Sequence, residues 1–357
     1  MSKYIIKRIL IAIPVLIGIT IIDYAIMCLA GSSGNASGPQ DFEAAVEAKR
    51  IALGLDQPFY VQYFVWLGQL LHGNMGYSLK SYQSVSSMIG SHLGPTLLLM
   101  GASLIVSLIM AVPAGIYSAI HQYSKGDYTV VTLSFLGSSI PGFFLSLLLI
   151  FLFTVKLGWL PSSGMNTLGA SGGALDVAKH MVMPVLVLAT SMAGTNIRYI
   201  RSAVLEILQQ DYLRTAKAKG IGRFKVINKH ALRNALIPIV TVIGMEIPML
   251  FGGQVIIEQV FSWPGLGLMT MSAITNRDYP VIMGVCLLSA VVVLAANLLT
   301  DILYALVILR FSCNRSKADM WKKKQTEEPK NKDITRESYL QTVFRRFRRH
   351  HLAAVSL

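Results

Sequence analysis

Cysteine and the short motifs of hydrolytic enzymes are scarce or absent in this chain. Its cysteines are Cys28, Cys286 and Cys313, and none forms a CxxC pair. The sequence therefore predicts neither a disulfide framework nor a cysteine metal site. A GxxxxGK(S/T) phosphate loop and an HExxH pair are both missing, and the seven histidines do not cluster with acidic residues. We expect no nucleotide, other cofactor or catalytic metal to be bound by this chain.

Charge is also scarce. Charged residues form 14% of the 357 residues, whereas apolar residues form 53%. A soluble globular domain carries about a quarter charged residues, and apolar runs of roughly 20 residues predict bilayer spans. The net charge of +14 would suit nucleic-acid binding if it were spread over the surface of a soluble domain. Instead, the basic residues are concentrated in particular segments between the apolar stretches.

Six apolar stretches predict transmembrane helices, at residues 9–30, 95–120, 129–155, 181–200, 235–257 and 282–308. The first follows three basic residues, but it is too long for a signal peptide and lacks a convincing cleavage site. If the N-terminus is inside, the cytoplasmic segments hold 26 of the 32 Lys and Arg residues. Positive charge is retained in the cytoplasm, so we expect an all-α integral membrane protein with both termini in the cytoplasm.

These spans divide the chain into four parts. Residues 1–30 form the N-terminus and first span, and residues 31–94 form an external scaffold segment. Within that segment, Phe59–Leu71 repeats apolar residues at a helical period and Phe42–Leu53 has helical composition. Residues 95–308 contain the other five spans and a basic cytoplasmic loop at 206–234. The polar tail, residues 309–357, has a composition that predicts disorder.

The most distinctive segment runs from Asp211 to Pro238, DYLRTAKAKGIGRFKVINKHALRNALIP. Nine Lys and Arg lie between Arg198 and Arg233, against only two acidic residues. The composition up to Lys219 permits a short helix, which a glycine at position 220 is suited to end. The cations could pair with acidic groups on a partner. An ordinary positive-inside loop is the simpler alternative.

The order Arg214, Thr215, Ala216, three residues and Gly220 resembles the loop by which permease subunits of ATP-binding-cassette (ABC) importers engage their ATPases. Other motifs along residues 1–306 resemble the same family, in its dipeptide, oligopeptide and nickel branch. They are Tyr4 with Arg8 and Pro14, Gly54–Pro58 with Tyr63, Gly73 with Gly76–Ser78, Pro113 with Gly115, Ser139–Phe144, Leu157–Pro161, Glu258 with Phe261–Gly267, Arg277–Pro280, and Asn297, Leu298, Asp301 and Tyr304.

This resemblance implies the type I ABC importer permease fold and the import of di- or oligopeptides, or of a nickel chelate, by alternating access. It implies a bacterial inner-membrane location and three kinds of partner. These are a homologous second permease subunit, two ATPase subunits that bind ATP and magnesium, and an extracytoplasmic substrate-binding protein. The residues implied to couple to the ATPase are Arg214, Thr215, Ala216, Lys217, Lys219 and Gly220. Trp263, Pro264 and Gly265 are implied to lie in a short segment at the outer mouth.

Three acidic residues, Asp23, Glu246 and Asp301, fall within predicted spans. A charge in hydrocarbon costs at least about 2.5–3.5 kcal/mol on insertion scales, so each should face the bundle or a wet cavity. Glu246 has two interpretations. It could lie in the translocation path and contact a peptide ammonium or a cation, or it could form an interhelical hydrogen bond. Asp23 and Asp301 better suit a structural role.

Two regions depart from the family. Gly31–Gly34 replaces a Pro-Gly-Asp-Pro-like string, and the chain continues beyond Leu309 where the family ends. Thr335–Leu357 resembles the start of the partner permease. The tail is therefore either the product of a frameshift or read-through between adjacent permease genes, or a regulatory extension.

Two other functional classes compete with the importer permease. A stand-alone secondary transporter or channel would predict inverted repeats, and the sequence shows no convincing one. An integral-membrane enzyme would need a catalytic cluster within the spans, and the sequence contains none. We therefore expect a transport subunit, with ATP hydrolysis performed by its partners.

Overall fold

The computed structural model describes residues 2–31, 58–167, 169, 173–222, 225–226, 231–248, 250 and 254–300. These residues belong to the first of two compact units, Met1–Val307. In these ranges the secondary structure is helical, apart from an isolated antiparallel bridge between Tyr77 and Ser84. The predicted helix at Phe42–Leu53, the predicted role of Asp301 and the tail all lie outside the described residues.

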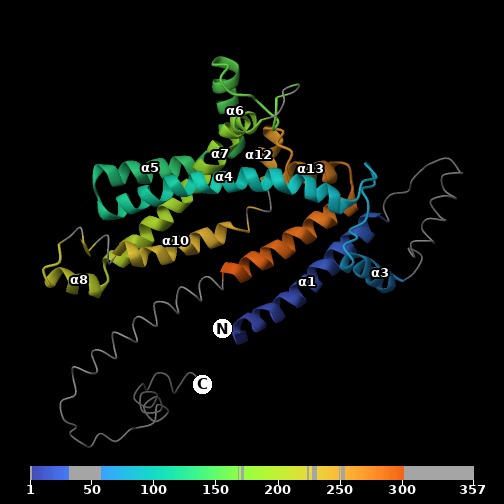
Figure 1. Cartoon of the computed structure of the whole chain (residues 1–357), viewed down its shortest axis with the longest axis horizontal. Coiled ribbons are helices and arrows are strands. Elements are labelled where there is room, and N and C mark those ends of the chain that lie inside the picture. Colours follow the sequence, from blue (N-terminus) through green and yellow to red (C-terminus); the bar gives the residue numbers. More distant parts are fainter. Residues whose placement is uncertain are drawn as a thin grey trace, which may run out of the picture. The chain divides into compact units, whose positions relative to one another are not determined.

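Three helices form the central layer of the fold. α4 (Val85–Ile120) and α7 (Ala174–Leu208) pack along each other, and α5 (Lys125–Ser139) runs beside both (Figure 1). Their contacts depend on small residues. A Cβ on Gly194 of α7 would lie 2.5 Å from the carbonyl oxygen of Ser134 in α5. Helices in a membrane associate through such close packing, because lipid offers apolar side chains as good an environment as a neighbouring helix does.

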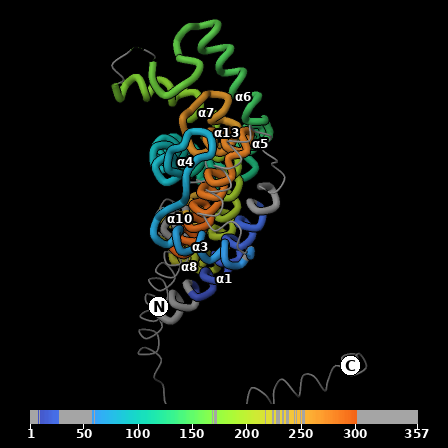
Figure 2. The backbone as a smooth tube through the Cα atoms, turned by 90° about the vertical axis from the view of Figure 1, so that its right-hand side faces the viewer, coloured from blue at the N-terminus to red at the C-terminus, as the bar shows by residue number. Residues whose placement is uncertain are grey.

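A second group of helices packs through aromatic side chains. α1 (Ser2–Gly31) lies beside α3 (Phe59–Leu71), as Figure 2 also shows. Tyr24 of α1 meets Tyr63 of α3 edge-to-face at 5.8 Å, and the Tyr63 hydroxyl lies 2.8 Å from that of Thr20. Met283, from the helix Tyr279–Thr300, completes this cluster. The predicted helix Phe59–Leu71 is thereby confirmed.

Two predicted spans are broken rather than continuous. The stretch at 129–155 turns by 94° between α5 and α6 (Gly142–Leu149), which continues as a π-helix, η1 (Ile150–Lys156). Pro141 lies at this break, because proline lacks an N–H and its ring disfavours helical geometry in the residue before it. The stretch at 235–257 also divides: α10 (Leu232–Glu246) ends before Pro248, and α12 (Val255–Val260) begins separately. Both breaks lie beside a proline within a predicted span, and proline removes a helical hydrogen bond and bends or breaks the helix.

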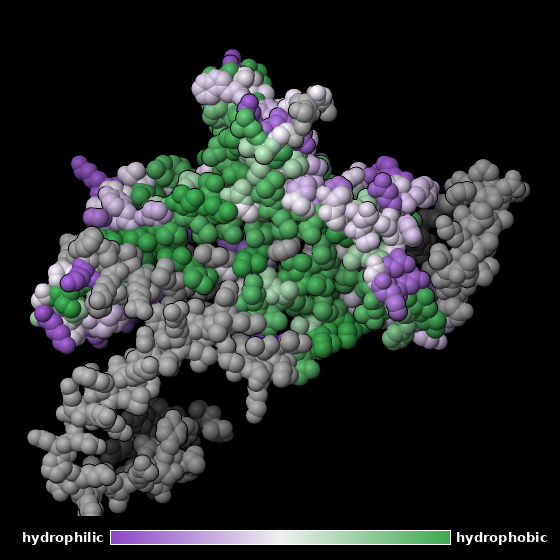
Figure 3. All heavy atoms as spheres, in the orientation of Figure 1, coloured by the Kyte–Doolittle hydropathy of each residue, from purple (hydrophilic) through white to green (hydrophobic). Residues whose placement is uncertain are grey.

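The described helices suit a membrane protein. α4, α7 and Tyr279–Thr300 are long and apolar enough to cross a bilayer, and the bent α5–α6 pair would provide a fourth crossing. α1, with the shorter apolar helix Leu10–Ile26, and α10 occupy the other two predicted spans. Hydrophobic side chains cover the middle of the visible face, while hydrophilic ones gather towards its two ends (Figure 3).

We expect Gly194→Val to destabilise the α5–α7 contact, because the added carbons would collide with the backbone of Ser134. Overpacking of this kind costs about 1–3 kcal/mol. Gly101→Val is the matched control, since a Cβ at Gly101 meets nothing within 4 Å. Thermal unfolding of the purified protein in detergent should show a lower midpoint for Gly194→Val alone. Equal midpoints for the two variants would contradict this account of the packing.

Candidate functional site

The predicted coupling segment forms a short helix, α8 (Asp211–Ala218), at the end of α7 (Figure 1). Leu213 and Ala216 are buried and pack with Ile207 and Leu208 of α7. Because these two positions are three residues apart, they lie on one face of the helix. The apolar face of α8 is therefore held against its own chain, and only the other face is free.

The exposed face of α8 carries polar and cationic residues. Arg214 and Thr215 are exposed, as is Lys219 just beyond the helix, while Lys217 lies within α8. Arg214 is 3.7 Å from Asp211 in a solvent-exposed pair, and such pairs contribute little to stability. This cationic face is therefore not neutralised by a strong internal ion pair.

Gly220 ends this segment in a left-handed conformation, with φ of +77°. Two backbone hydrogen bonds close the turn: the Lys219 N–H donates to the Thr215 carbonyl at 3.0 Å, and the Ile221 N–H to the Ala216 carbonyl at 3.3 Å. Glycine adopts this φ without the strain that a Cβ brings. The predicted end of the helix at Gly220 therefore coincides with a backbone conformation that favours glycine.

α8 is also linked to the helix that follows it. The side-chain amide of Asn234 in α10 donates to the Tyr212 hydroxyl at 2.7 Å. On the other side, only Gln209 and Gln210 separate α8 from α7. A displacement of α8 would therefore act directly on both α7 and α10.

An ion pair between a partly exposed arginine and a buried carboxylate connects α7 to α5. The Arg201 guanidinium donates two hydrogen bonds to the Asp127 carboxylate, from Nε to Oδ1 and from Nη2 to Oδ2, both at 2.8 Å. Asp127 is only 2% exposed. It also accepts from the Ser118 hydroxyl of α4 and, at 2.9 Å, from the Tyr123 N–H. We call this group the Asp127 clamp; it ties the ends of α4, α5 and α7 together.

Arg198 makes a second link between α7 and α5. Its Nη1 donates to the Ser134 carbonyl at 3.2 Å and to the Ser138 hydroxyl at 3.0 Å, and the guanidinium lies 4.6 Å from the centre of the Phe135 ring. Sequence reasoning counted Arg198 and Arg201 only as part of the positive charge of the loop. The partner of Arg201 could have been sought in the short segment between the second and third predicted spans, residues 121–128, where Asp127 is the only acidic residue.

A buried carboxylate organises the opposite end of the layer. Glu258 of α12 has no exposed surface. The Thr96 hydroxyl donates to its Oε1 at 3.1 Å, and the N–H of Leu268, in α13 (Leu266–Thr275), donates to Oε2 at 3.0 Å. Thr96 Oγ1 in turn accepts from the Leu266 N–H at 2.7 Å. Glu258 and Thr96 thus satisfy N–H groups at the start of α13 that no helical carbonyl can reach.

The three residues predicted at an outer mouth lie beside this carboxylate. Trp263 is fully buried and donates from Nε1 to the Pro95 carbonyl at 2.9 Å. Pro264 is half-buried, and a Cβ on Gly265 would lie 2.5 Å from Glu258 Oε2. The structure therefore brings these residues together in a packed junction of α4, α12 and α13, where Trp263 acts as an anchor and has no exposed surface.

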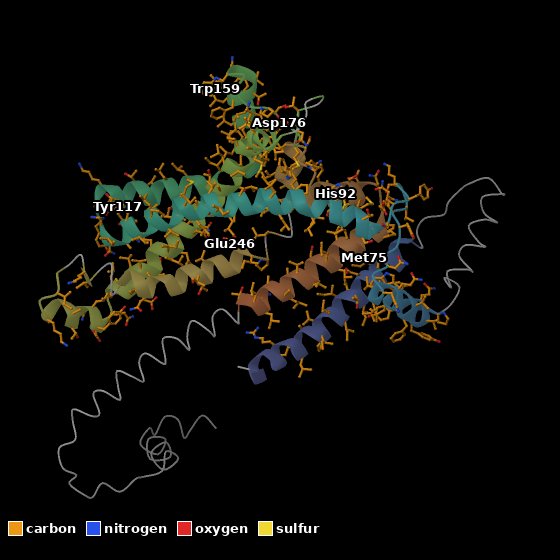
Figure 4. All side chains as sticks on the ribbon, viewed as in Figure 1. Met75, His92, Tyr117, Trp159, Asp176 and Glu246 are labelled. Carbon is orange, nitrogen blue, oxygen red and sulfur yellow. The ribbon has the colours of Figure 1, made fainter. Side chains whose placement is uncertain are left out.

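Glu246 lies half-buried at the end of α10 (Figure 4). Its carboxyl group interacts with the side chain of Asn196 from α7. The Asn196 amide is 3.5 Å from the Ser107 hydroxyl of α4. Three helices thus contribute polar groups to one region between apolar surfaces. In contrast, Asp23 Oδ2 is buried without a hydrogen-bond partner among the described residues. Over the same ranges, no three His, Cys, Asp or Glu residues gather as a metal-ligand set.

Comparison with known families gives two matches that cover most of the chain. Residues 111–312 match the family described as binding-protein-dependent transport system inner membrane component. Residues 1–100 match the N-terminal region described for the membrane component of the same systems.

Curated relatives match the chain over nearly their whole length. The oligopeptide transport system permease protein AppB of Bacillus subtilis is 44% identical over 311 residues, which cover 86% of this chain and 98% of AppB. A putative peptide permease protein of Brucella ovis is 43% identical over 315 residues, with the same coverage. The glutathione transport system permease protein GsiC of Escherichia coli is 37% identical over 309 residues, again covering 86% of this chain and 98% of GsiC.

Among solved structures, an inward-facing MetNI methionine ABC transporter is similar, with a TM-score of 0.49 and 18% identity, over 62% of this chain and 96% of that one. The family matches and the curated relatives decide the assignment. The chain belongs to the family of binding-protein-dependent transport system inner membrane components, the permease subunits of ABC importers.

Proposed function

We propose that this permease imports peptides or peptide-like molecules, with α8 as the helix through which separate ATPase subunits drive it. The observation that carries this proposal is the geometry of α8. Its apolar side is buried by Leu213 and Ala216, its cationic side is free, and Gly220 stops it at a defined point. Peptide cargo is supported by the Bacillus subtilis and Brucella ovis relatives, which are an oligopeptide transport permease and a putative peptide permease.

The proposed orientation places α8 and both termini in the cytoplasm, because that arrangement retains most of the Lys and Arg residues on the inner side. ATP and magnesium would be bound by the ATPase subunits, and this chain would catalyse no reaction. A homologous second permease subunit would complete the pore, and a substrate-binding protein would deliver cargo from outside.

In this mechanism, closure of the ATPase pair moves α8, and α7 follows because only two residues separate them. The Asp127 clamp and Arg198 then transmit the movement of α7 to α5 and α4. Three helices would thereby move as one body relative to α10. This relative movement would alternate the access of the cavity between the two sides of the membrane.

To test α8, we would reverse the charge of its free face with Arg214→Glu and Lys219→Glu together. The control is Lys125→Glu, an exposed residue at the start of α5 on the same predicted side. We expect the double variant to lose co-purifying ATPase and at least about tenfold of the peptide uptake in proteoliposomes, because repulsion replaces attraction across the interface. Thermal stability should be unchanged. Normal ATPase recovery would rule out α8 as the contact.

Arg201→Gln tests the transmission step. Losing the guanidinium leaves the Asp127 carboxylate buried without a counter-charge, which costs about 3–5 kcal/mol when one partner of a buried pair is removed. We expect uptake to fall at least about fivefold more than ATP hydrolysis in the assembled complex. Arg201→Lys, which retains a charge, should restore part of the coupling. A parallel loss of both activities would mean that the clamp only stabilises the fold.

Glu246→Gln separates the two interpretations of this carboxylate. A residue in the path that contacts the ammonium of a peptide predicts a rise of about tenfold in the KM for peptides with a free N-terminus, and little change for N-acetylated peptides. An interhelical hydrogen bond predicts equal effects on both substrates. Uptake of a matched peptide pair measures the difference, and Asp23→Asn serves as the control for loss of an acidic group in a span.

A further inference from the structure

A cavity of about 300 Å³ lies at the predicted external side, where the loop of residues 77–84 meets α4 and α13. Its floor is apolar and includes Met88, Leu268 and Met269, while its rim carries Ser81, Ser272 and Asn276. His92 of α4, labelled in Figure 4, also lines it. The cavity is large enough for a bulky side chain, and its rim can form hydrogen bonds with the polar part of whatever enters.

The loop beside the cavity is held in place by a buried carboxylate. Asp278 is buried; one of its oxygens accepts from the Ser78 hydroxyl and the other from the Leu79 N–H at 3.1 Å. The Tyr77–Ser84 bridge closes the base of the loop. The loop is therefore ordered before any partner arrives, which lowers the conformational entropy lost on binding.

This ordered loop exposes large side chains to solvent. Tyr82 is 79% exposed, and Tyr77 and Leu79 are exposed as well. Tyr82 and Arg277 have φ values of 58° and 54°, a left-handed conformation that is uncommon for residues other than glycine. Strained residues of this kind cluster at binding and switching sites, and exposed tyrosine and arginine are typical of protein interfaces.

The exposed charged residues beside the cavity are basic. Lys80, which donates to the Asn276 side chain, lines the cavity and is exposed, and Arg277, between the lining residues Asn276 and Asp278 in sequence, is exposed as well. Among the described residues that line the cavity, Asp278 is the only carboxylate, and its hydrogen bonds with the loop keep it buried. The rim is therefore cationic and would attract an acidic surface. Figure 3 shows hydrophilic side chains over this end of the molecule.

We propose that this surface, made of residues 77–84, Arg277 and the cavity, is where the substrate-binding protein docks. An acidic patch on that protein would face Lys80 and Arg277, and one apolar side chain would enter the cavity. This inference rests on the proposed function, since it requires an importer supplied by a binding protein. It assigns a docking role to a part of the chain that α8 and the Asp127 clamp do not involve.

The test uses the assembled transporter in nanodiscs and the system's purified substrate-binding protein. We expect Lys80→Glu with Arg277→Glu to raise the Kd of the binding protein at least tenfold, and Ser272→Trp, which fills the cavity, to do the same without a change of charge. Lys156→Glu, an exposed residue of η1, is the control. Basal ATP hydrolysis without the binding protein should be unchanged in all variants.

A photo-crosslinking residue at Tyr82 should yield an adduct with the binding protein, and the same residue at exposed Trp159 should not. Adducts with lipid alone, or an unchanged Kd in both cavity and charge variants, would overturn the docking site. If the wild-type complex recruits ATPase and responds to the binding protein in that case, the proposed function stands and only this inference fails. A wild-type chain that recruits no ATPase would overturn both.

Discussion

The ion pair between Arg201 and the buried Asp127 carboxylate is the interaction on which the proposed mechanism depends. A carboxylate removed from water needs a counter-charge, and the bidentate geometry here supplies it with two bonds of 2.8 Å. Because Ser118 joins the pair, separating α4, α5 or α7 would leave buried polar groups unpaired. Close contacts at Gly115 and Gly194 reinforce the same arrangement. In the proposed mechanism these three helices therefore move as a rigid body when α8 is displaced.

Buried carboxylates organise both ends of this body. At one end Asp127 holds Arg201, and at the other Glu258 satisfies the start of α13 while Thr96 ties it to α4. Near the latter, Asp278 holds the loop of residues 77–84. Asp127 and Glu258 each accept from groups on different elements, and Asp278 accepts two hydrogen bonds from one loop. Within the part of the chain that the structure describes, these three buried carboxylates therefore join separate segments of the fold.

Several parts of this organisation were predictable from local sequence. The helix at Phe59–Leu71, the short helix before Gly220 and the apolar spans follow from periodicity, composition and turn chemistry, which act over a few residues. The breaks at Pro141 and before Pro248 had a local signal in the prolines. That signal was ambiguous, because membrane helices often continue through proline when neighbours satisfy the freed backbone groups.

By itself, the sequence determined that the chain is a membrane-spanning helical protein, how its basic residues are distributed and where α8 lies, because these follow from residue types close together in the chain. Only the tertiary structure decided that Arg201 binds Asp127, 74 positions away, that Glu258 binds Thr96, and that Trp263 is buried. The physical reason is that a polar group between helices is satisfied by whichever element packs against it. That partner is set by the packing of the whole bundle, which no local pattern specifies.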